Sequence, residues 1–296
     1  MTNAVTIAQG GSTGVIAGFK NRLINGNMSI NQRGVTSGLV GGYFVDRWQI
    51  GGLSTSGLSP SVPTGFTQGI SLTRPSAGSV WLYQNIESTN CADLYGKQVT
   101  VSFWAYNATG INSISVSLNV PTLQNNFASV TTMATNTVTS SPAAAWTYYS
   151  TTFTVSSTSV ALGLQVYIFG TALGAATMYI TGVQLEVGTV ATSFDWRPYG
   201  IELLMCQRYY FQGSSPSTYY RASTNSTAAT PVAVSFPTEM RVSPTLTVTA
   251  FANNDIAANG GATVVNKNGV IFRLYSTTGG YDYAYGVWTF NVSAEL

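Results

Sequence analysis

The sequence contains no histidine. This absence excludes Ser-His-Asp and Cys-His nucleophiles, histidine metal ligands and a histidine-based pH switch. Acid–base chemistry would therefore depend on the ten carboxylates of the chain. Glycoside hydrolysis needs two carboxyl groups ~5–9.5 Å apart, and the acids that are close in sequence are Glu87 with Asp93 and Glu186 with Asp195. Because the carboxylates are sparse, we expect the protein not to be an enzyme.

Charged residues are also scarce. They make up 7% of the chain, against roughly 25% in ordinary soluble proteins. The net charge is +2 without any run of lysine or arginine, so we expect no nucleic-acid partner. No stretch approaches the ~18 apolar residues of a membrane span, and the N-terminal sequence lacks the basic and apolar regions of a signal peptide. Low charge also suits a chain that hides surface against copies of itself.

Cysteine is limited to Cys91 and Cys206, which are far apart in the sequence. Lone cysteines in proteins assembled in a reducing compartment are most often small buried hydrophobic residues. We therefore expect two free, buried thiols without a disulfide bridge.

What the sequence does have is alternation of apolar and polar residues. It runs through residues 99–108, 113–120, 146–155, 159–170 and 176–188, with turn signals NATG, TSSPAAA and GTALGA between them. Short alternating strands at this spacing predict an antiparallel sandwich or jelly roll. Pro198 and the apolar spacing of IELLMCQRYY predict a short linker helix over residues 198–210. Residues 211–296 return to a β pattern, in which NKNG predicts a hairpin with a type I′ turn.

Two pairs of motifs resemble bacteriophage tail-fibre and virion structural proteins. The first is NRLINGNMSINQRG followed by GYFVDRW (residues 21–34 and 42–48), and the second is VQLEVGTVATSFDWRP followed by CQRYY (183–198 and 206–210). In addition, YQNIE, GKQVTVSFW and MYITGVQLE resemble the strands of a carbohydrate-binding-module-like jelly roll. The resemblance implies an all-β fold: a jelly-roll β-sandwich, a short helical linker and a smaller C-terminal β-domain. The expected divisions are a flexible attachment segment 1–20, the jelly roll 21–197, the linker 198–210 and the C-terminal domain 211–296.

The resemblance implies a non-enzymatic virion protein that is assembled in the host cytoplasm. The expected role is a tail fibre or receptor-binding appendage that recognises host-surface glycans. It would form a homotrimer and contact other virion proteins through its N-terminal segment. The first alternative is a capsid decoration or head-fibre protein with a purely structural role, and the second is a glycan depolymerase. No cofactor is expected, although carbohydrate-binding modules of this kind often hold a structural calcium ion.

Aromatic residues are the strongest indication of a ligand, because flat rings cover the C–H faces of sugars. Tyrosines in loops rich in Ser and Gly are typical of recognition surfaces. The expected glycan-binding residues are Tyr219, Tyr220, Tyr281, Asp282, Tyr283 and Tyr285. The alternative is that these tyrosines form a subunit interface.

A second set of residues belongs to the phage-like motifs and is expected to be structural. Asp46, Arg47 and Trp48 form the DRW block, and Asp46 and Arg47 are expected to make ion pairs. Glu186 is expected to cap backbone N–H groups or to pair with Arg197. Gly188 is expected to supply a turn that requires glycine, and Arg197 to be partly buried in a pair with Asp195 or Glu186.

Overall fold

The computed structural model describes residues 19–52, 55–216, 218–221, 230–254, 262–274 and 283–296. Within these residues the chain is all-β apart from one α-helix and three short 3-10 helices, which confirms the predicted fold class. The first domain is built on one nine-stranded antiparallel sheet. Its strands are β1 (Gly42–Val45), β2 (Trp48–Gly51), β3 (Thr55–Leu58), β4 (Ile70–Arg74), β5 (Gly78–Ile86), β6 (Gln98–Leu123), β7 (Asn126–Thr139), β8 (Thr147–Thr154) and β9 (Leu164–Val187). The 3-10 helices are η1 (Ser88–Asn90), η2 (Ala92–Leu94) and η3 (Thr158–Leu162).

Two long strands, β6 and β9, form the spine of this domain. They pair antiparallel from Val99 opposite Val187 to Asn119 opposite Gln165. The predicted turns at NATG and GTALGA are wrong, because each lies inside one of these continuous strands. Register shifts between Asn107 and Ser113 bend the strand instead of ending it. At this bend Gly110 has φ +68°, and a Cβ there would lie 2.1 Å from a backbone oxygen of β9.

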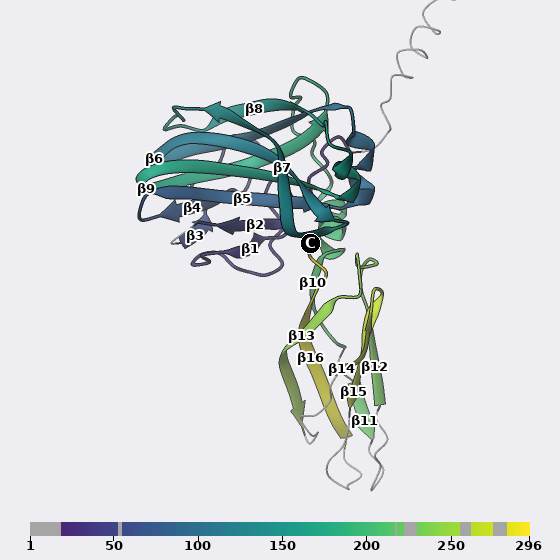
Figure 1. Ribbon diagram of the computed structural model, residues 1–296. Coiled ribbons are helices and arrows are strands. Elements are labelled where there is room, and N and C mark those ends of the chain that lie inside the picture. Colours follow the sequence, from purple (N-terminus) through teal and green to yellow (C-terminus); the bar gives the residue numbers. More distant parts are fainter. Residues whose placement is uncertain (1–18, 53–54, 217, 222–229, 255–261, 275–282) are drawn as a thin grey trace, which may run out of the picture.

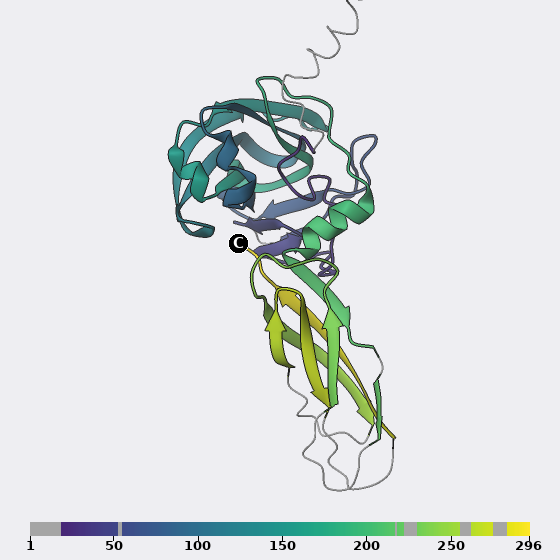
Figure 2. The ribbon, with the colours of Figure 1, turned by 90° about the vertical axis from the view of Figure 1, so that its right-hand side faces the viewer.

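The bend divides the sheet into two halves that close around a single core (Figures 1 and 2). In the first half β1, β2 and β5 pair on one side of β9, and β7 pairs with β6 on the other side. In the second half β3 and β4 extend from β9, and β8 pairs with β6. Buried side chains of both halves, such as Leu82 of β5 and Leu72 of β4, belong to one hydrophobic cluster. The other face of each half is therefore an outer surface of the domain.

The second domain extends from one end of the first (Figure 1). Helix α2 (Tyr199–Gln207) lies at the junction, as Figure 2 shows, and buries Glu202 and Cys206. The domain contains a four-stranded and a three-stranded sheet around a core that includes Trp288 and Phe290. Its strands are β10 (Tyr210–Ser214), β11 (Thr218–Arg221), β12 (Thr230–Ser235), β13 (Thr245–Asn254), β14 (Ala262–Asn266), β15 (Gly269–Leu274) and β16 (Tyr283–Ser293).

The NKNG hairpin is present between β14 and β15, with Asn266 opposite Gly269. The predicted type I′ turn is wrong, because neither Lys267 nor Asn268 has a positive φ. The Asn266 side chain instead accepts hydrogen bonds from the N–H groups of Asn268 (2.8 Å) and Gly269 (3.1 Å). An asparagine side chain that binds the backbone two residues on stabilises such a turn without left-handed residues.

Both cysteines are free and buried, as predicted. Burial raises the pKa of the Cys91 thiol to about 12 and raises that of Cys206 well above its usual value. Among the helices of the described residues, none is long and apolar enough to cross a membrane.

Candidate functional site

A row of aromatic side chains stands on the outer face of the first half-sheet. Trp81 and Tyr83 project from β5, and Tyr167 and Phe169 project from β9, which is paired with β5. Their neighbours along each strand, such as Leu82, are fully buried. Because side chains alternate between the two faces of a strand, burial of one set places the other set on the surface.

The rings of this row touch one another. The ring centres of Trp81 and Tyr83 are 5.5 Å apart, with planes at 16°. The centres of Tyr83 and Tyr167 are 6.1 Å apart, with planes at 28°, and Phe169 lies 5.4 Å from Tyr167. All four side chains are half-buried, so the row presents a partly exposed apolar surface along two strands.

Gly51 on the neighbouring strand β2 makes room for the Trp81 ring. It is opposite Trp81 in the sheet, and a Cβ at Gly51 would lie 2.1 Å from Cζ2 of the indole. Any other residue at position 51 would displace the ring. The position of the aromatic row therefore depends on a glycine that makes no side-chain contact of its own.

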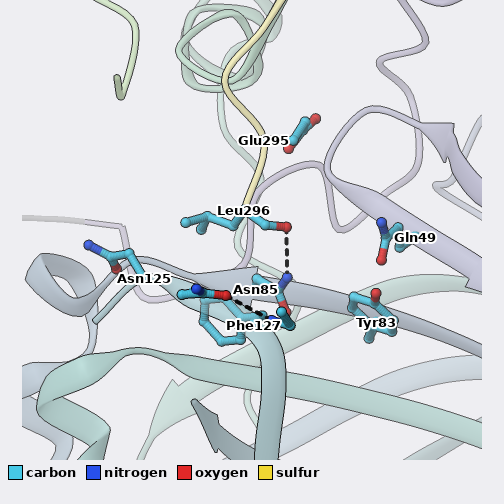
Figure 3. Close-up of a pocket in the computed structure, with 9 residues that line it drawn as sticks. Gln49, Tyr83, Asn85, Asn125, Phe127, Glu295 and Leu296 are labelled. Carbon is cyan, nitrogen blue, oxygen red and sulfur yellow. Dashed lines mark hydrogen bonds between the residues drawn. The ribbon is translucent and has the colours of Figure 1, made fainter. Parts of the chain in front are cut away.

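The row leads into a cleft of about 560 Å³, shown in Figure 3. Tyr83 and Gln49 lie on one side of it, and Asn125 of the β6–β7 turn and Phe127 of β7 lie on the other. The full lining consists of Gln49, Tyr83, Asn85, Asn125, Asn126, Phe127, Ala128, Glu295 and Leu296. Most of these polar residues are amides, which can both donate and accept hydrogen bonds.

Amide side chains continue along the sheet from the floor of the cleft. Asn119 donates to Gln165 (2.8 Å), and Gln165 donates to Asn85 (2.9 Å). Asn85 in turn donates to the carbonyl of Leu296 (3.0 Å), as the dashed line in Figure 3 shows. This series of hydrogen bonds fixes the orientation of Asn85, so its amide group is held in place at the floor of the cleft.

The protonation states of the phenols in the aromatic row and of the acid in the cleft follow from their surroundings. Burial raises the pKa of Tyr83, and burial together with Tyr83 raises the pKa of Tyr167 to about 12. Both phenols are therefore neutral hydrogen-bonding groups near pH 7. The acidic side chain in the lining, Glu295, is paired with Arg33 (3.0 Å) and with Arg47. Its charge is thus compensated from within the protein.

The DRW block lies at the junction of the two domains rather than at a ligand site. Asp46 accepts a hydrogen bond from the Gln32 N–H (3.0 Å) and pairs with Arg33 (3.3 Å). Arg47 pairs with Glu295, so each charged residue of the block finds its partner elsewhere in the chain. Burial raises the pKa of Asp46 to about 6, although the hydrogen bonds from Gln32 and the charge of Arg33 oppose this shift. The indole of Trp48 is buried and donates to the carbonyl of Asn25 (2.8 Å).

The expected partners of Arg197 are wrong. Arg197 is buried, but it pairs with Glu202 of α2 at 3.0 Å rather than with Asp195 or Glu186. The helix turns Glu202 inward beneath Arg197, and the sequence-near acid Asp195 instead accepts a hydrogen bond from the N–H of Asn21.

Glu186 adopts the other arrangement that was expected for it. It caps the following turn by accepting hydrogen bonds from the N–H (2.8 Å) and hydroxyl (2.7 Å) of Thr192. Gly188 has φ +133°, a conformation that favours glycine, as the expected turn requires.

The predicted glycan-binding residues belong to the C-terminal part of the chain. Tyr281 and Asp282 lie outside the described residues. For Tyr219, Tyr220, Tyr283 and Tyr285 the backbone alone is described, and it places Tyr219 of β11 opposite Tyr285 of β16. Their role in binding stays a prediction.

Sequence reasoning missed the aromatic row, although a signal for it was present. In SVWLYQNI, Trp81, Tyr83 and Asn85 alternate with apolar or buried residues. Neighbouring strands must be placed beside β5 before Tyr167 and Gln49 can be seen to belong to the same surface. In the described residues, no three acidic or cysteine side chains gather in a way that could hold a metal ion.

No known family model matches the chain, and no curated protein matches its sequence. Several solved structures have a partly similar backbone. The enzymatically active domain of tailspike protein 4 from bacteriophage CBA120 matches with a TM-score of 0.39 and 16% identity, over 57% of this chain and 22% of the tailspike chain. The module TmCBM61, solved with β-1,4-galactotriose, matches with a TM-score of 0.36 and 13% identity, over 57% of this chain and 99% of the module. The CBM22-2 xylan-binding domain of Paenibacillus barcinonensis Xyn10C matches with a TM-score of 0.35 and 16% identity, over 48% of this chain and 92% of that domain.

Proposed function

We propose that the first domain binds a glycan in the cleft and along the aromatic row, without cleaving it. The observation that carries this proposal is the continuity of three rings, Trp81, Tyr83 and Tyr167, with a cleft lined mainly by amides. A sugar presents C–H groups on one face and hydroxyl groups around its edge. The rings can cover the first, and side chains such as Gln49 and Asn125 can bind the second.

The energetics of such a site favour weak, repeated binding. Aromatic contacts contribute about 0.5–1.5 kcal/mol each beyond the area that they bury. Few charged groups take part, so binding would depend little on salt. Several weak sites on one particle would together hold a surface firmly through avidity.

The state of the acidic residues supports binding rather than hydrolysis. A glycosidase needs two carboxyl groups that flank the sugar bond. Every acidic side chain in the described residues already has an ion-pair or hydrogen-bond partner, and the one that lines the cleft, Glu295, faces two arginines. A glycan depolymerase is therefore the less favoured alternative.

The test is a glycan array built from host-surface oligosaccharides and probed with variants of the full chain. Trp81→Ala and Tyr167→Ala should each weaken binding about tenfold, as expected for the loss of ~1.4 kcal/mol. Tyr95→Ala is the matched control, since Tyr95 is 54% exposed and belongs neither to the aromatic row nor to the cleft lining. Unchanged binding in both aromatic-row variants, with normal melting temperatures, would refute the proposed site.

We further propose that the protein is a tail fibre or receptor-binding appendage of a phage virion, assembled in the host cytoplasm as a homotrimer. The motifs at residues 21–34, 42–48 and 183–210 support this role through their resemblance to phage virion proteins. The alternative is a capsid decoration or head-fibre protein. Sedimentation equilibrium should give three times the chain mass, and imaging of labelled particles should place the label on the tail. A label over the whole shell would favour the decoration protein.

A further inference from the structure

A second cleft, of about 570 Å³, opens on the outer face of the other half-sheet. Its floor is made by Ser102 and Trp104 of β6, with Tyr148 of β8 beside them and Gly182 of β9. Its walls come from the loop at residues 64–66 and from the segment 191–196 that follows β9. None of these residues lines the first cleft.

Five aromatic rings gather in this second cleft. Phe66, Phe194 and Trp196 form a triad with ring centres 4.9–5.3 Å apart. Trp104 and Tyr148 form a pair with centres 5.4 Å apart. Trp196 is 50% exposed and Tyr148 is 40% exposed, so two large rings remain open to a ligand although others of the cluster pack behind them.

The backbone is shaped to bring these rings together. Gly182 has φ +63°, and a Cβ there would lie 2.7 Å from the Phe66 ring and 3.1 Å from Trp104. Thr192 is held by the Glu186 carboxylate, and its carbonyl accepts a hydrogen bond from the Tyr148 hydroxyl (3.3 Å). The wall and the floor of the cleft are therefore tied to each other.

The remaining lining is polar but uncharged. It supplies the hydroxyl groups of Thr64, Ser102, Thr192 and Ser193, and no acidic or basic residue lines the cleft. Lys20 contacts the edge of the cleft, where its Nζ lies 3.4 Å from the Thr192 hydroxyl at an exposed position. The lining combines aromatic rings with hydroxyl groups and contains no charged side chain. Such a lining matches a neutral ligand that has both apolar faces and hydroxyl groups.

From this geometry we infer that the second cleft is a separate binding site for a neutral oligosaccharide. A cleft of this volume is in the range of small-ligand sites. The inference does not depend on the first cleft, because the two share no lining residue. Since they lie on outer faces of opposite half-sheets, one domain would engage two glycan chains at once.

The test uses single variants of the full chain on an array of neutral and acidic oligosaccharides. The variant Trp81→Ala impairs the first cleft. It should still bind the neutral oligosaccharides that the second cleft recognises. Trp196→Ala and Tyr148→Ala should each weaken this retained binding about tenfold, and Tyr95→Ala should not. Two variants are used because Trp196 also packs on Phe194 and Tyr148 also donates to the carbonyl of Thr192. These contacts differ, so a local rearrangement in one variant is not expected in the other.

The possible results separate the two proposals. If glycan binding is lost in Trp81→Ala but unchanged in Trp196→Ala and Tyr148→Ala, the first site is supported and the second is overturned. The second site is also overturned if the Trp81→Ala variant binds only acidic oligosaccharides, or binds no oligosaccharide at all. Failure of the first site alone would appear as binding that is insensitive to Trp81 and sensitive to Trp196 and Tyr148. If Trp196→Ala and Tyr148→Ala reduce the sedimenting mass and leave glycan binding unchanged, the cleft is an interface between copies of the chain.

Discussion

The guanidinium group of Arg47 lies 3.5 Å from the centre of the Tyr209 ring. These residues belong to the DRW block and to the CQRYY segment, which are more than 150 positions apart in the sequence. Arg47 also pairs with Glu295 and donates to the carbonyl of Asn85 (2.7 Å). One buried arginine therefore joins the first domain, the segment after α2 and the end of β16.

The other phage-like motifs meet at the same junction. Asn25 of the opening motif donates to the carbonyls of Ile30 (2.8 Å) and Asp46 (2.9 Å). Its own N–H donates to Glu202 of α2, which also pairs with Arg197. The motifs that resemble phage proteins thus help to join the two domains, and residues 191–196 of the motif at 183–198 also form a wall of the second cleft.

Replacing Arg47 with alanine should destabilise the folded chain severely. Its side chain is 1% exposed, and its removal leaves the Glu295 carboxylate without this partner. Breaking a buried pair in this way costs about 3–5 kcal/mol, which would be measured as the free energy of unfolding in urea. The matched control is Arg22→Ala, because Arg22 pairs with Asp93 on the surface. That loss should be about 0–1 kcal/mol, and equal losses in the two variants would contradict the role of Arg47.

Asp46 should make stability depend on pH. Its folded pKa of about 6 is above the ordinary value of 3.8, so the folded state binds the proton more tightly than the unfolded state does. The resulting stabilisation is fully present below pH ~4 and is lost as the pH rises through ~6, a change of about 3 kcal/mol. In Asp46→Asn this loss should be missing. Unfolding free energies of both proteins between pH 4 and pH 8 would test this.

Glu87 provides a control of opposite sign. Burial alone would raise the pKa of its carboxyl group, but hydrogen bonds from Arg208 and Tyr209 hold this pKa below its usual value. Its stabilisation is therefore present at neutral pH and lost on acidification through the lowered pKa. Relative to the parent, Glu87→Gln should be most destabilised at neutral pH, whereas Asp46→Asn should be most destabilised in acid. Parallel pH profiles for the two variants would rule out this assignment.

Gly51→Ala should weaken glycan binding without changing a binding residue. The added Cβ would overlap the Trp81 ring, so the indole must leave its place in the aromatic row. Binding to the first cleft should fall about as far as in Trp81→Ala, roughly tenfold. Gly174→Ala is the matched control, since a Cβ there meets no atom within 4 Å. If Gly51→Ala binds as the parent does, the row does not form the ligand surface.

The two thiols should report whether the junction unfolds with the first domain. Their raised pKa values keep them as thiols, and the thiolate is the reactive form, so a thiol reagent should label neither in the folded protein at pH 8. The variant Cys206→Ala leaves Cys91 as a probe of the first domain, and Cys91→Ala leaves Cys206 as a probe of α2. Because the buried pair of Arg197 with Glu202 and the partly exposed pair of Arg208 with Glu87 tie α2 and the residue after it to the first domain, both probes should become reactive at the same urea concentration. Labelling of Cys206 at clearly lower urea would show an independent junction.

The sequence predicted the strands well and their connections less well. The alternation at 99–108 and 113–120 was correctly identified as β-structure, but these segments are one strand, β6. Glycine and asparagine in NATG favour a turn locally, whereas pairing with β9 on both sides of the bend keeps these residues within one strand. The Thr-rich strand β7 lacks apolar alternation, so the pattern did not indicate it.

The two clefts could not be predicted from the sequence for a similar reason. Trp81 and Tyr167 are 86 positions apart and become neighbours through the register of β5 with β9. Likewise, Arg197 was expected to pair with the nearest acids in sequence, but the start of α2 brings Glu202 to it. Pairing across strands and helix orientation decide such contacts, and neither can be deduced from local spacing.

Two segments connect the second domain to the first. The chain leaves the first domain through α2, and Glu295 after β16 pairs with Arg33 and Arg47 of the first domain. The two segments lie side by side, because the Ala294 N–H donates to the carbonyl of Tyr209 (2.7 Å) and Arg47 contacts both Tyr209 and Glu295. A mechanical force on the second domain would therefore reach the first domain through this one cluster of buried residues.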